Sequence, residues 1–222
     1  MKKNVLVGQS GGPTAVINAS LYGVVTESLK HDEEIDTVYG MVNGIEGFLA
    51  DHYLDLSHTL GSRELELLKL TPAAYLGSCR FKLPEDLNSE VYRTLFRKFE
   101  ALNIGYFFYI GGNDSMDTVS KLSRYAAAVK SGIRVIGVPK TIDNDLIMTD
   151  HTPGFGSAAK YAASMVREIA LDASVYQQKS VTIIELMGRH AGWVTAASAL
   201  ARRHAGDNPL LIYMPEVPFS ME

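Results

Sequence analysis

The sequence predicts an α/β protein with mostly parallel sheets that helices cover. Short apolar segments alternate with longer segments whose apolar residues recur at the 3.6-residue spacing of a helix. Each apolar segment ends in glycine or polar residues, as strands of a parallel sheet do where they enter a loop. Alternation of this kind is typical of helices that cross back over a parallel sheet.

In the first lobe, the opening apolar segment is followed by residues 15–29, whose apolar side chains form a helical stripe. The pattern is less regular between 50 and 75. An amphipathic helix then leads into residues 106–110, which are too aromatic and apolar to be anything but an interior strand. We expect strands at 5–8, 37–42, 106–110 and 133–138, and helices at 15–29, 63–70, 89–103 and from the turn at 111–115 to about 129.

The chain is expected to pass into a second lobe near residue 145, so the predicted domains are residues 1–145 and 146–222. A turn at 153–157 precedes a long helix in that lobe. We expect helices at 158–171 and 191–203 and strands at 181–186 and 210–214.

Composition is that of an ordinary globular protein. Apolar residues make up 46% and charged residues 21%, and a net charge of −4 leaves no basic face for nucleic acid. The longest apolar stretch, near 191–201, is too short to span a bilayer, and no signal peptide precedes the first strand. The single cysteine, Cys79, excludes an internal disulfide. We expect a cytoplasmic protein that binds neither nucleic acid nor a membrane.

Residues 137–145 read Gly-Val-Pro-Lys-Thr-Ile-Asp-Asn-Asp, and the function is interpreted around them. Pro139 ends the preceding strand because it has no N–H to donate. Loops at the carboxyl ends of parallel strands bind ligands in open α/β sheets. There, Lys140 can hold phosphate charge and Asp143 can accept a proton from a hydroxyl that attacks phosphorus. Taken alone, the segment is explained equally well as a polar turn.

Two glycine turns, 10–12 and 111–115, each lie between a strand and a helix. Free N–H groups and the helix dipole favour an anion at such a turn, and glycine lets the backbone approach it. A purely structural turn is an equal alternative for the first. In the second, Asp114 fits a metal ligand beside phosphate, whereas Asp114 or Ser115 also fits a helix cap. The sequence pattern does not separate these interpretations.

A further turn ends in Cys79-Arg80. The Arg80 guanidinium suits bidentate recognition of a phosphate, although a solvated surface arginine is the simpler explanation of the residue alone. Cys79 has no convincing catalytic partner, so we expect a small buried side chain.

These motifs, together with Met187-Gly188-Arg189 and Pro215-Glu216, have the order and spacing of the phosphofructokinase family, which the chain resembles over essentially its whole length. The resemblance implies two Rossmann-like lobes with mostly parallel, helix-covered sheets. Residues 1–145 would bind a phosphoryl donor, and 146–222 would begin the lobe that binds fructose 6-phosphate. The resemblance also implies that the second lobe and the end of the first are incomplete in this chain, and that the protein is a homo-oligomer.

The resemblance implies roles for individual residues as well. Asp143 would take the proton from the 1-hydroxyl of fructose 6-phosphate, assisted by Lys140 and Arg80. Mg²⁺ is the expected cofactor, and Asn113 stands where the family usually has its metal-binding aspartate. Donor contacts are expected at Gly11, Gly12, Asp114, Ser115 and Lys140. Sugar-phosphate contacts are expected at Thr141, Ile142, Asp143, Asp145, Met187, Gly188, Arg189 and Glu216.

Asp114 and Lys140 together indicate the donor. Many relatives that use ATP have glycine at both positions, whereas relatives that use pyrophosphate have aspartate and lysine. A carboxylate at 114 repels the α-phosphate of ATP, and a lysine at 140 offsets the charge of pyrophosphate. We therefore expect phosphoryl transfer from pyrophosphate to fructose 6-phosphate. An ATP-dependent 6-phosphofructokinase and a non-catalytic regulatory subunit that binds phosphosugar are the alternatives.

Overall fold

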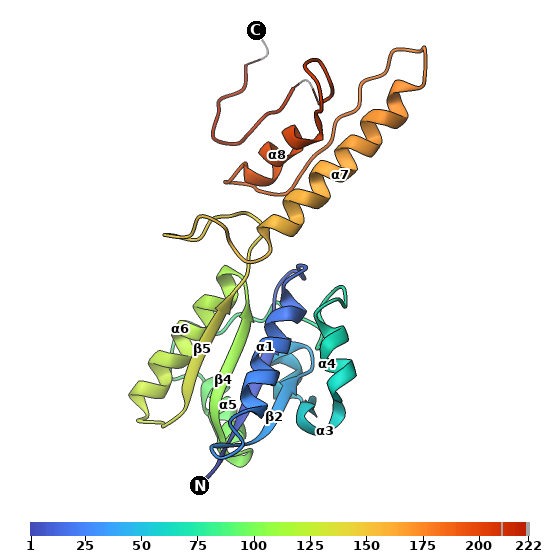
Figure 1. The fold of residues 1–222 in the computed structure, drawn as a ribbon. Helices are drawn as coiled ribbons and strands as arrows, with labels where there is room; N and C mark the ends of the chain where they lie inside the picture. The colour runs from blue at the N-terminus through green and yellow to red at the C-terminus, as the bar shows by residue number, and fades with distance from the viewer. Residues whose placement is uncertain (210, 221–222) are drawn as a thin grey trace. The chain divides into compact units, whose positions relative to one another are not determined.

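The computed structural model describes residues 1–209 and 211–220, which form two compact units (Figure 1). Unit 1 is Met1–Lys140 and unit 2 is Thr141–Glu222. The two units are considered separately below. None of the helices in the described residues is both long and apolar enough to cross a membrane.

Unit 1 is built on a five-stranded sheet with the strand order β3-β2-β1-β4-β5. Four of its strands are parallel, and a short antiparallel strand forms one edge beside β2. The strands are β1 (Lys3–Gln9), β2 (Ile35–Met41), β3 (Tyr53–Asp55), β4 (Ile104–Gly111) and β5 (Arg134–Pro139). The prediction of a mostly parallel sheet is confirmed in this unit, and the short strand β3 was not foreseen.

Helices connect these strands and cover both faces of the sheet. They are α1 (Ile17–Leu29), α2 (Gly44–Leu49), α3 (Leu56–Thr59), α4 (Ser62–Leu68), α5 (Glu90–Ala101) and α6 (Asn113–Ala128). The helices expected at 15–29, 63–70, 89–103 and up to about 129 are confirmed within a few residues. The short helices α2 and α3 lie in the stretch where the sequence pattern was irregular.

Alternating side chains of the buried strands divide the core of unit 1 into two clusters. Leu6 of β1 and Phe107 of β4 face one side, where they pack with aromatic residues of α5 and α6. Val5 and Val7 face the other side, where they pack with α1, α3 and α4. Because both faces of a parallel sheet are covered, its strands read as continuous apolar runs.

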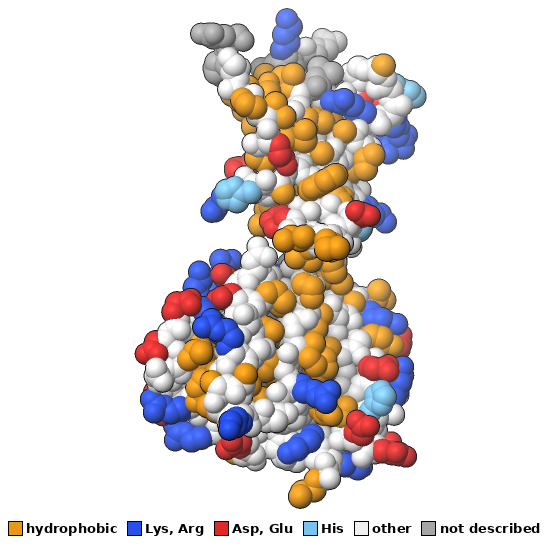
Figure 2. Space-filling view, turned by 90° about the vertical axis from the view of Figure 1, so that its left-hand side faces the viewer, with side chains coloured by type: hydrophobic (Ala, Val, Ile, Leu, Met, Phe, Trp, Pro, Cys, Tyr) orange, Lys and Arg blue, Asp and Glu red, His pale blue; other side chains and the backbone are white. Residues whose placement is uncertain are grey.

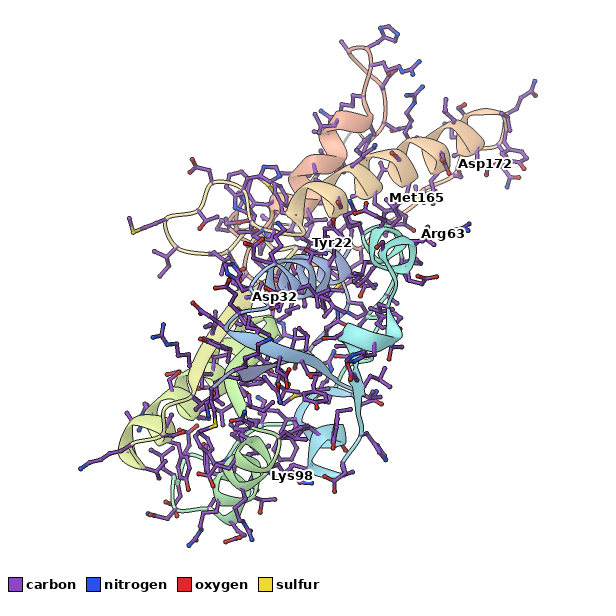
Figure 3. All side chains as sticks on the ribbon, turned by 60° about the horizontal axis from the view of Figure 1, so that its bottom comes forward. Tyr22, Asp32, Arg63, Lys98, Met165 and Asp172 are labelled. Atoms are coloured by element: carbon purple, nitrogen blue, oxygen red, sulfur yellow. The ribbon has the colours of Figure 1, made fainter. Side chains whose placement is uncertain are left out.

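Helices α1 and α4 lie beside each other on one face of the sheet. Tyr22 on α1 (Figure 3) donates a hydrogen bond from its hydroxyl to Glu66 Oε1 on α4 at 2.6 Å. Tyr22 is half-buried, but the hydrogen bond itself is exposed to solvent, so it contributes little beside the apolar contacts beneath it. The packing of these helices comes mainly from the leucine and valine side chains of the second cluster.

Unit 2 contains the long helix α7 (Phe155–Ser174), the short helix α8 (Trp193–Ala197) and a 3₁₀ turn η1 (Ser198–Ala201). Helix α7 packs against both of the shorter elements. The helix expected at 158–171 is confirmed and is longer at both ends. The helix expected at 191–203 is shorter than predicted, and its last turn is 3₁₀.

The prediction of strands at 181–186 and 210–214 is wrong for the described residues. Residues 181–186 and 211–214 have no regular secondary structure. Leu210 lies outside the described residues. A strand requires a neighbour for its N–H and C=O groups, and in the described part of unit 2 no strand pairs with either segment. Val181 and Ile183 are therefore each 91% exposed, and hydrophobic side chains gather on the upper part of Figure 2.

We expect Leu6→Ala to lower the free energy of unfolding of unit 1 by about 2–5 kcal/mol, because it removes a fully buried side chain from the first cluster. Leu70→Ala makes the same chemical change at a residue that is 83% exposed and should change it by less than about 0.5 kcal/mol. Urea denaturation followed by circular dichroism measures both. Equal effects of the two substitutions would contradict the assignment of the core.

Candidate functional site

In unit 1 the strand order makes the space outside the carboxyl ends of β1 and β4 the expected ligand crevice of such a fold. Strand β1 pairs with β2 on one side and with β4 on the other, so the direction of strand addition reverses between β1 and β4. Ligands of open α/β sheets bind outside the carboxyl ends of the strands at such a reversal. The glycine turn 10–12 follows β1, and the turn 111–113 follows β4. The sheet therefore brings the two predicted glycine turns together.

The two turns touch each other. Ser10 donates its backbone N–H to Ile110 O at 2.9 Å. A Cβ added to Gly111 would lie 3.1 Å from Ser10 O and 1.9 Å from Ser115 Oγ. Glycine at 111 is therefore required by packing, whether or not a ligand binds. Gly11 has a φ of +77°, which also favours glycine without reference to a ligand.

Gly12 differs from these two glycines. No atom lies within 4 Å of the position that a Cβ on Gly12 would occupy, and its φ is not positive. Neither packing nor backbone geometry therefore requires glycine there. Close approach of a ligand is the remaining physical reason for a residue without a side chain at this position.

Lys140 lies at the same crevice, immediately after β5. Its backbone N–H donates to Gly111 O at 2.9 Å, and its side-chain Nζ would lie 3.7 Å from a Cβ on Gly11. The residue is only 6% exposed, and this burial lowers the pKa of its ammonium. In the described residues no carboxylate pairs with that ammonium. A buried cation beside a glycine turn is thus left without a counter-charge, which favours binding of an anion.

Two buried amides, which the sequence analysis did not single out, hold the turn after β1 in place. Gln9 Nε2 donates to Asn18 Oδ1 on α1 at 3.0 Å, and Gln9 Oε1 accepts from Leu76 N at 2.9 Å. Asn18 Nδ2 in turn donates to Thr71 O and Ala73 O, both at 2.8 Å. Because both amides are almost completely buried, these bonds fix the segment 71–76 against the turn. In the sequence, the available signal was Asn18, a polar residue between the apolar Ile17 and Ala19 of the expected helix.

The segment that carries Arg80 is bound directly to the first glycine turn. Cys79 O accepts hydrogen bonds from Ser10 Oγ at 3.2 Å and from Gly11 N at 3.3 Å. Ser78 Oγ donates to Gly11 O at 2.6 Å. The N–H of Gly11, which was expected to bind donor phosphate, thus contacts Cys79 in this structure. Cys79 is buried, as predicted, and Arg80 beside it is exposed.

Asn113 and Asp114 form the first turn of α6. The residue at the N-cap is Gly112, which has no side chain, so the alternative interpretation of Asp114 or Ser115 as the cap of this helix is wrong. Asp114 is exposed and pairs with Lys82 Nζ at 3.5 Å. The sequence analysis assigned no role to Lys82. The only indication in the sequence was its position two residues after Arg80. The Asp114 carboxylate is therefore available to act on a ligand rather than on the helix.

In unit 2, the loop that follows Lys140 is held by its own side chains. Thr141 Oγ1 donates to Asp145 Oδ1 at 2.9 Å and accepts from Asp143 N at 3.0 Å. Asn144, with a φ of +58°, donates to Asp150 O at 3.1 Å and accepts from Thr152 N at 2.9 Å. The interpretation of this segment as a self-capped polar turn is therefore correct for Thr141, Asn144 and Asp145.

Asp143 is the exception in this loop. Only its backbone is used by the turn, and the described residues provide no hydrogen bond to its carboxylate. Burial, and after it the charge of Asp145, raise the pKa of Asp143. A half-buried carboxylate with a raised pKa and no partner has the properties of a general base.

The turn 187–189 and Glu216 lie elsewhere in unit 2. Met187 and Arg189 are exposed, and Gly188 has a φ of +123°. Glu216 Oε1 accepts from Gly192 N at 2.7 Å, just before α8. In the described part of the chain, no hydrogen bond joins these residues to the loop 141–145. Ile142, between Thr141 and Asp143, is half-buried.

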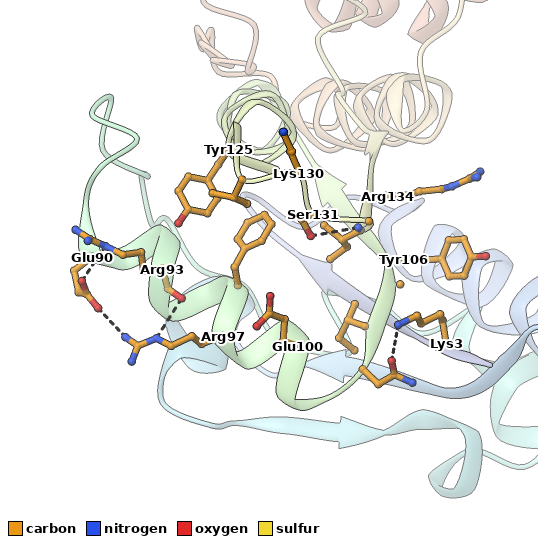
Figure 4. Close-up of a pocket in the computed structure, with 17 residues that line it drawn as sticks. Lys3, Glu90, Arg93, Arg97, Glu100, Tyr106, Tyr125, Lys130, Ser131 and Arg134 are labelled. Atoms are coloured by element: carbon orange, nitrogen blue, oxygen red, sulfur yellow. Dashed lines mark hydrogen bonds and ion pairs between the residues drawn. The ribbon is translucent and has the colours of Figure 1, made fainter. Parts of the chain in front are cut away.

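Unit 1 also has a cavity apart from the predicted site. A cavity of about 980 Å³ lies at the amino ends of β4 and β5, away from every predicted site residue (Figure 4). There Glu90 already pairs with Arg93 at 3.1 Å and with Arg97 at 2.7 Å, which reduces the free positive charge. The described residues contain no cluster of three or more His, Cys, Asp or Glu side chains that could hold a metal ion.

Known proteins resemble this chain over its whole length. A family model described as "Phosphofructokinase" matches residues 4–222. The pyrophosphate–fructose 6-phosphate 1-phosphotransferases of Rhodospirillum rubrum and Halomonas elongata are 46% and 45% identical, over 100% and 97% of this chain and over 53% and 52% of their own lengths. The crystal structure of pyrophosphate-dependent phosphofructokinase from Marinobacter aquaeolei is 45% identical, with a TM-score of 0.88 over 98% of this chain and 54% of that chain. This chain therefore spans about half the length of the relatives it matches.

We expect Gly111→Ala to lower the free energy of unfolding of unit 1 by about 1–3 kcal/mol, because the new Cβ would overlap Ser115 Oγ. Gly12→Ala, the matched control, should leave stability unchanged within about 0.5 kcal/mol, because the added methyl group enters open space. Thermal and urea denaturation measure both. Destabilisation by the control alone would show that the geometry of the turns is wrong.

Proposed function

We propose that this chain, which belongs to the phosphofructokinase family, acts in the transfer of a phosphoryl group from pyrophosphate to the 1-hydroxyl of fructose 6-phosphate, giving fructose 1,6-bisphosphate. The observation that carries the proposal is the buried Lys140 ammonium at the crevice of unit 1, beside the turn 10–12 and without a carboxylate partner in the described residues. A small, highly charged anion such as pyrophosphate supplies the missing counter-charge.

The donor binds at the two glycine turns of unit 1 in this proposal. Gly12 leaves room for phosphate oxygens to approach the backbone, and Gly11 lies beside the Lys140 ammonium. Ser115, which is buried against Gly111, shapes the second turn rather than reaching out to the donor. Arg80 and Lys140 neutralise charge on the transferring group, which is the main form of catalysis in phosphoryl transfer.

Asp114 determines the donor in this proposal. Its carboxylate is exposed at the first turn of α6, and Lys82 at 3.5 Å neutralises it only in part because both side chains are solvated. The α-phosphate of a nucleoside triphosphate would meet this carboxylate and be repelled. Pyrophosphate has no third phosphate and avoids the contact.

Asp143 is the general base. Its carboxylate is free to accept the proton of the sugar hydroxyl, because Thr141 and Asp145 satisfy each other within the loop. The raised pKa brings the carboxyl closer to the operating pH, which improves general-base catalysis. Residues expected to bind the sugar phosphate are Thr141, Ile142, Asp145, Met187, Gly188, Arg189 and Glu216.

Mg²⁺ would neutralise charge on the phosphates when it is bound. Mg²⁺ commonly uses one or two protein oxygens together with substrate phosphates. The exposed Asn113 amide at the start of α6 fits such a minor role and does not provide a cage by itself. A homo-oligomeric state belongs to the same proposal and follows from the family resemblance. A cytoplasmic location also belongs to it, because a single cysteine fits a reducing compartment.

Asn113 favours one further candidate, a non-catalytic regulatory subunit that binds phosphosugar, because it replaces a charged metal ligand with a neutral amide. The two candidates are separated by incubating the full-length protein with Mg²⁺, fructose 6-phosphate and either pyrophosphate or ATP. Formation of fructose 1,6-bisphosphate with pyrophosphate supports the proposal. Its formation only with ATP supports the ATP-dependent alternative, and no product with either donor supports the regulatory subunit.

We expect Asp143→Asn to lower turnover by about 10²- to 10⁴-fold in the full-length protein with little change in the KM for fructose 6-phosphate, because the substitution removes only proton acceptance. Asp150→Asn, at an exposed residue near the same loop, is the control and should retain turnover.

The same substitution has an expected effect on stability. Because the pKa of Asp143 is raised, the folded protein binds more protons than the unfolded chain, and stability falls as pH rises from about 3.9 through the raised pKa. The Asn variant lacks this loss, so it should be the more stable protein at neutral pH. Unchanged turnover in the variant would rule out Asp143 as the base.

We expect Asp114→Gly combined with Lys140→Gly to weaken pyrophosphate use by at least about tenfold and to raise the relative rate with ATP, because the repulsive carboxylate and the compensating cation are both removed. Initial rates with each donor measure the change. Lys30→Gly, at an exposed lysine far from the crevice in sequence, controls for loss of a positive charge. A variant with the same donor preference as the unsubstituted protein would contradict the assignment.

A further inference from the structure

The loop that carries Arg80 has no regular secondary structure between Cys79 and Ser89, yet it is firmly attached at two places. At its start, Cys79 O is bound by the first glycine turn. A few residues later, Leu83 is 3% exposed and belongs to the first core cluster. Arg80 projects from the short stretch between these two attachments.

The second attachment depends on a buried lysine of α6. The Lys121 side chain is 6% exposed. Its Nζ donates to Leu83 O at 3.2 Å and pairs with Glu85 Oε1 at 2.5 Å, both on the loop. It also pairs with Asp117 Oδ2, one turn earlier on α6, at 2.7 Å. All three N–H donors of the ammonium therefore have acceptors, two of them on the loop.

These contacts are costly to lose. A buried ammonium is tolerated only when it is paired and hydrogen-bonded, and Leu83 O would lose its bond from Lys121 if the ammonium were removed. The hydrogen bonds that Lys121 donates to Asp117 and Glu85 raise its pKa, so that it stays charged at physiological pH. Pro84 O, the next carbonyl, accepts from Tyr92 Oη at 2.6 Å. Side chains thus supply the hydrogen bonds that secondary structure would otherwise provide.

The same helix begins with two of the candidate site residues. Asn113 and Asp114 form the first turn of α6, and Lys121 lies about two turns further along it. Lys82, between Arg80 and Leu83, also pairs with α6 through Asp114 at 3.5 Å. The loop therefore runs along α6. The helix that carries Asp114 thus also fixes the position of Arg80.

We propose that Lys121 is a positioning residue, which holds the loop 81–85 on α6 and thereby sets the position of the Arg80 guanidinium for the transferring phosphoryl group. The inference rests on the proposed function in one respect, the role of Arg80. Lys121 itself touches no substrate, because Glu85, Asp117 and Leu83 O use its donors.

The test is Lys121→Met in the full-length protein, with Lys30→Met as the matched control. Lys30 forms an exposed pair with Glu27 at 2.8 Å, so the control removes an ion pair without affecting the loop. Hydrogen exchange followed by mass spectrometry should show faster exchange in peptides that cover 80–88 for Lys121→Met and no change there for the control. Unchanged exchange at 80–88 would overturn the proposal.

Kinetics separate positioning from a general effect on stability. Lys121→Met should lower kcat by about 10- to 100-fold, as expected when a catalytic group is displaced by about 1 Å, and leave the KM for fructose 6-phosphate unchanged. Lys121→Arg, which keeps the charge and the donors, should recover most of the kcat. Because Lys121 acts through Arg80, Lys121→Met should add little to the loss caused by Arg80→Ala. Additive losses would overturn the proposal.

If Lys121→Met cannot be obtained folded, Glu85→Gln combined with Asp117→Asn removes the two carboxylate partners, both of them exposed, and should give the same pattern in smaller degree. Absence of that pattern overturns the proposal. If the unsubstituted protein has no activity with pyrophosphate, the proposed function fails while the exchange experiment still decides whether Lys121 holds the loop.

Discussion

A lysine ammonium that is removed from water without a carboxylate beside it is the feature on which the rest of the site depends. Lys140 is 6% exposed, its backbone N–H donates to Gly111 O, and its Nζ would lie 3.7 Å from a Cβ on Gly11. A protein normally pairs such a charge or accepts a lowered pKa. Here the charge is placed at the carboxyl ends of parallel strands, where the fold itself provides space for a ligand. An anion that binds there gains the interaction that the chain leaves open.

The surrounding structure is best understood as support for that position. The buried amides of Gln9 and Asn18 fix the turn after β1, and the backbone of Lys140 is bound to Gly111 O. Cys79 and Leu83 are each anchored, which leaves Arg80 between them on a short span. Polar groups that are fully satisfied inside a core hold their geometry closely, and a phosphoryl-transfer site requires such geometry. The loop 141–145 follows the same principle, since Thr141 and Asp145 bind each other and leave the Asp143 carboxylate free.

Much of unit 1 could be predicted from the sequence because its signals are local. Strands 104–111 and 134–139 are continuous apolar runs, and α5 has a regular apolar stripe, so their type followed from periodicity. The strands expected at 181–186 and 210–214 have the same apolar character, but a strand exists only with a paired neighbour, and the described residues of unit 2 provide none. Likewise, the sequence left open whether Asp114 or Ser115 caps α6, and the structure shows that neither does, because the helix begins directly after Gly112.

By itself, the sequence determined the α/β class of unit 1, the carboxyl-end position of its motifs and the family to which those motifs belong, because all three depend on residue type and spacing along the chain. Only the tertiary structure decided which residues carry an unsatisfied charge and which are scaffold. Gly111 and Gly12 look alike in a sequence, yet one is required by Ser115 and the other faces open space. Residue type does not distinguish Lys121 from Lys140, yet the Lys121 ammonium has three acceptors. The Lys140 ammonium lies beside a glycine turn and has no carboxylate partner in the described residues. Such differences arise between segments far apart in the chain, and burial and pairing are set only when the sheet brings those segments together.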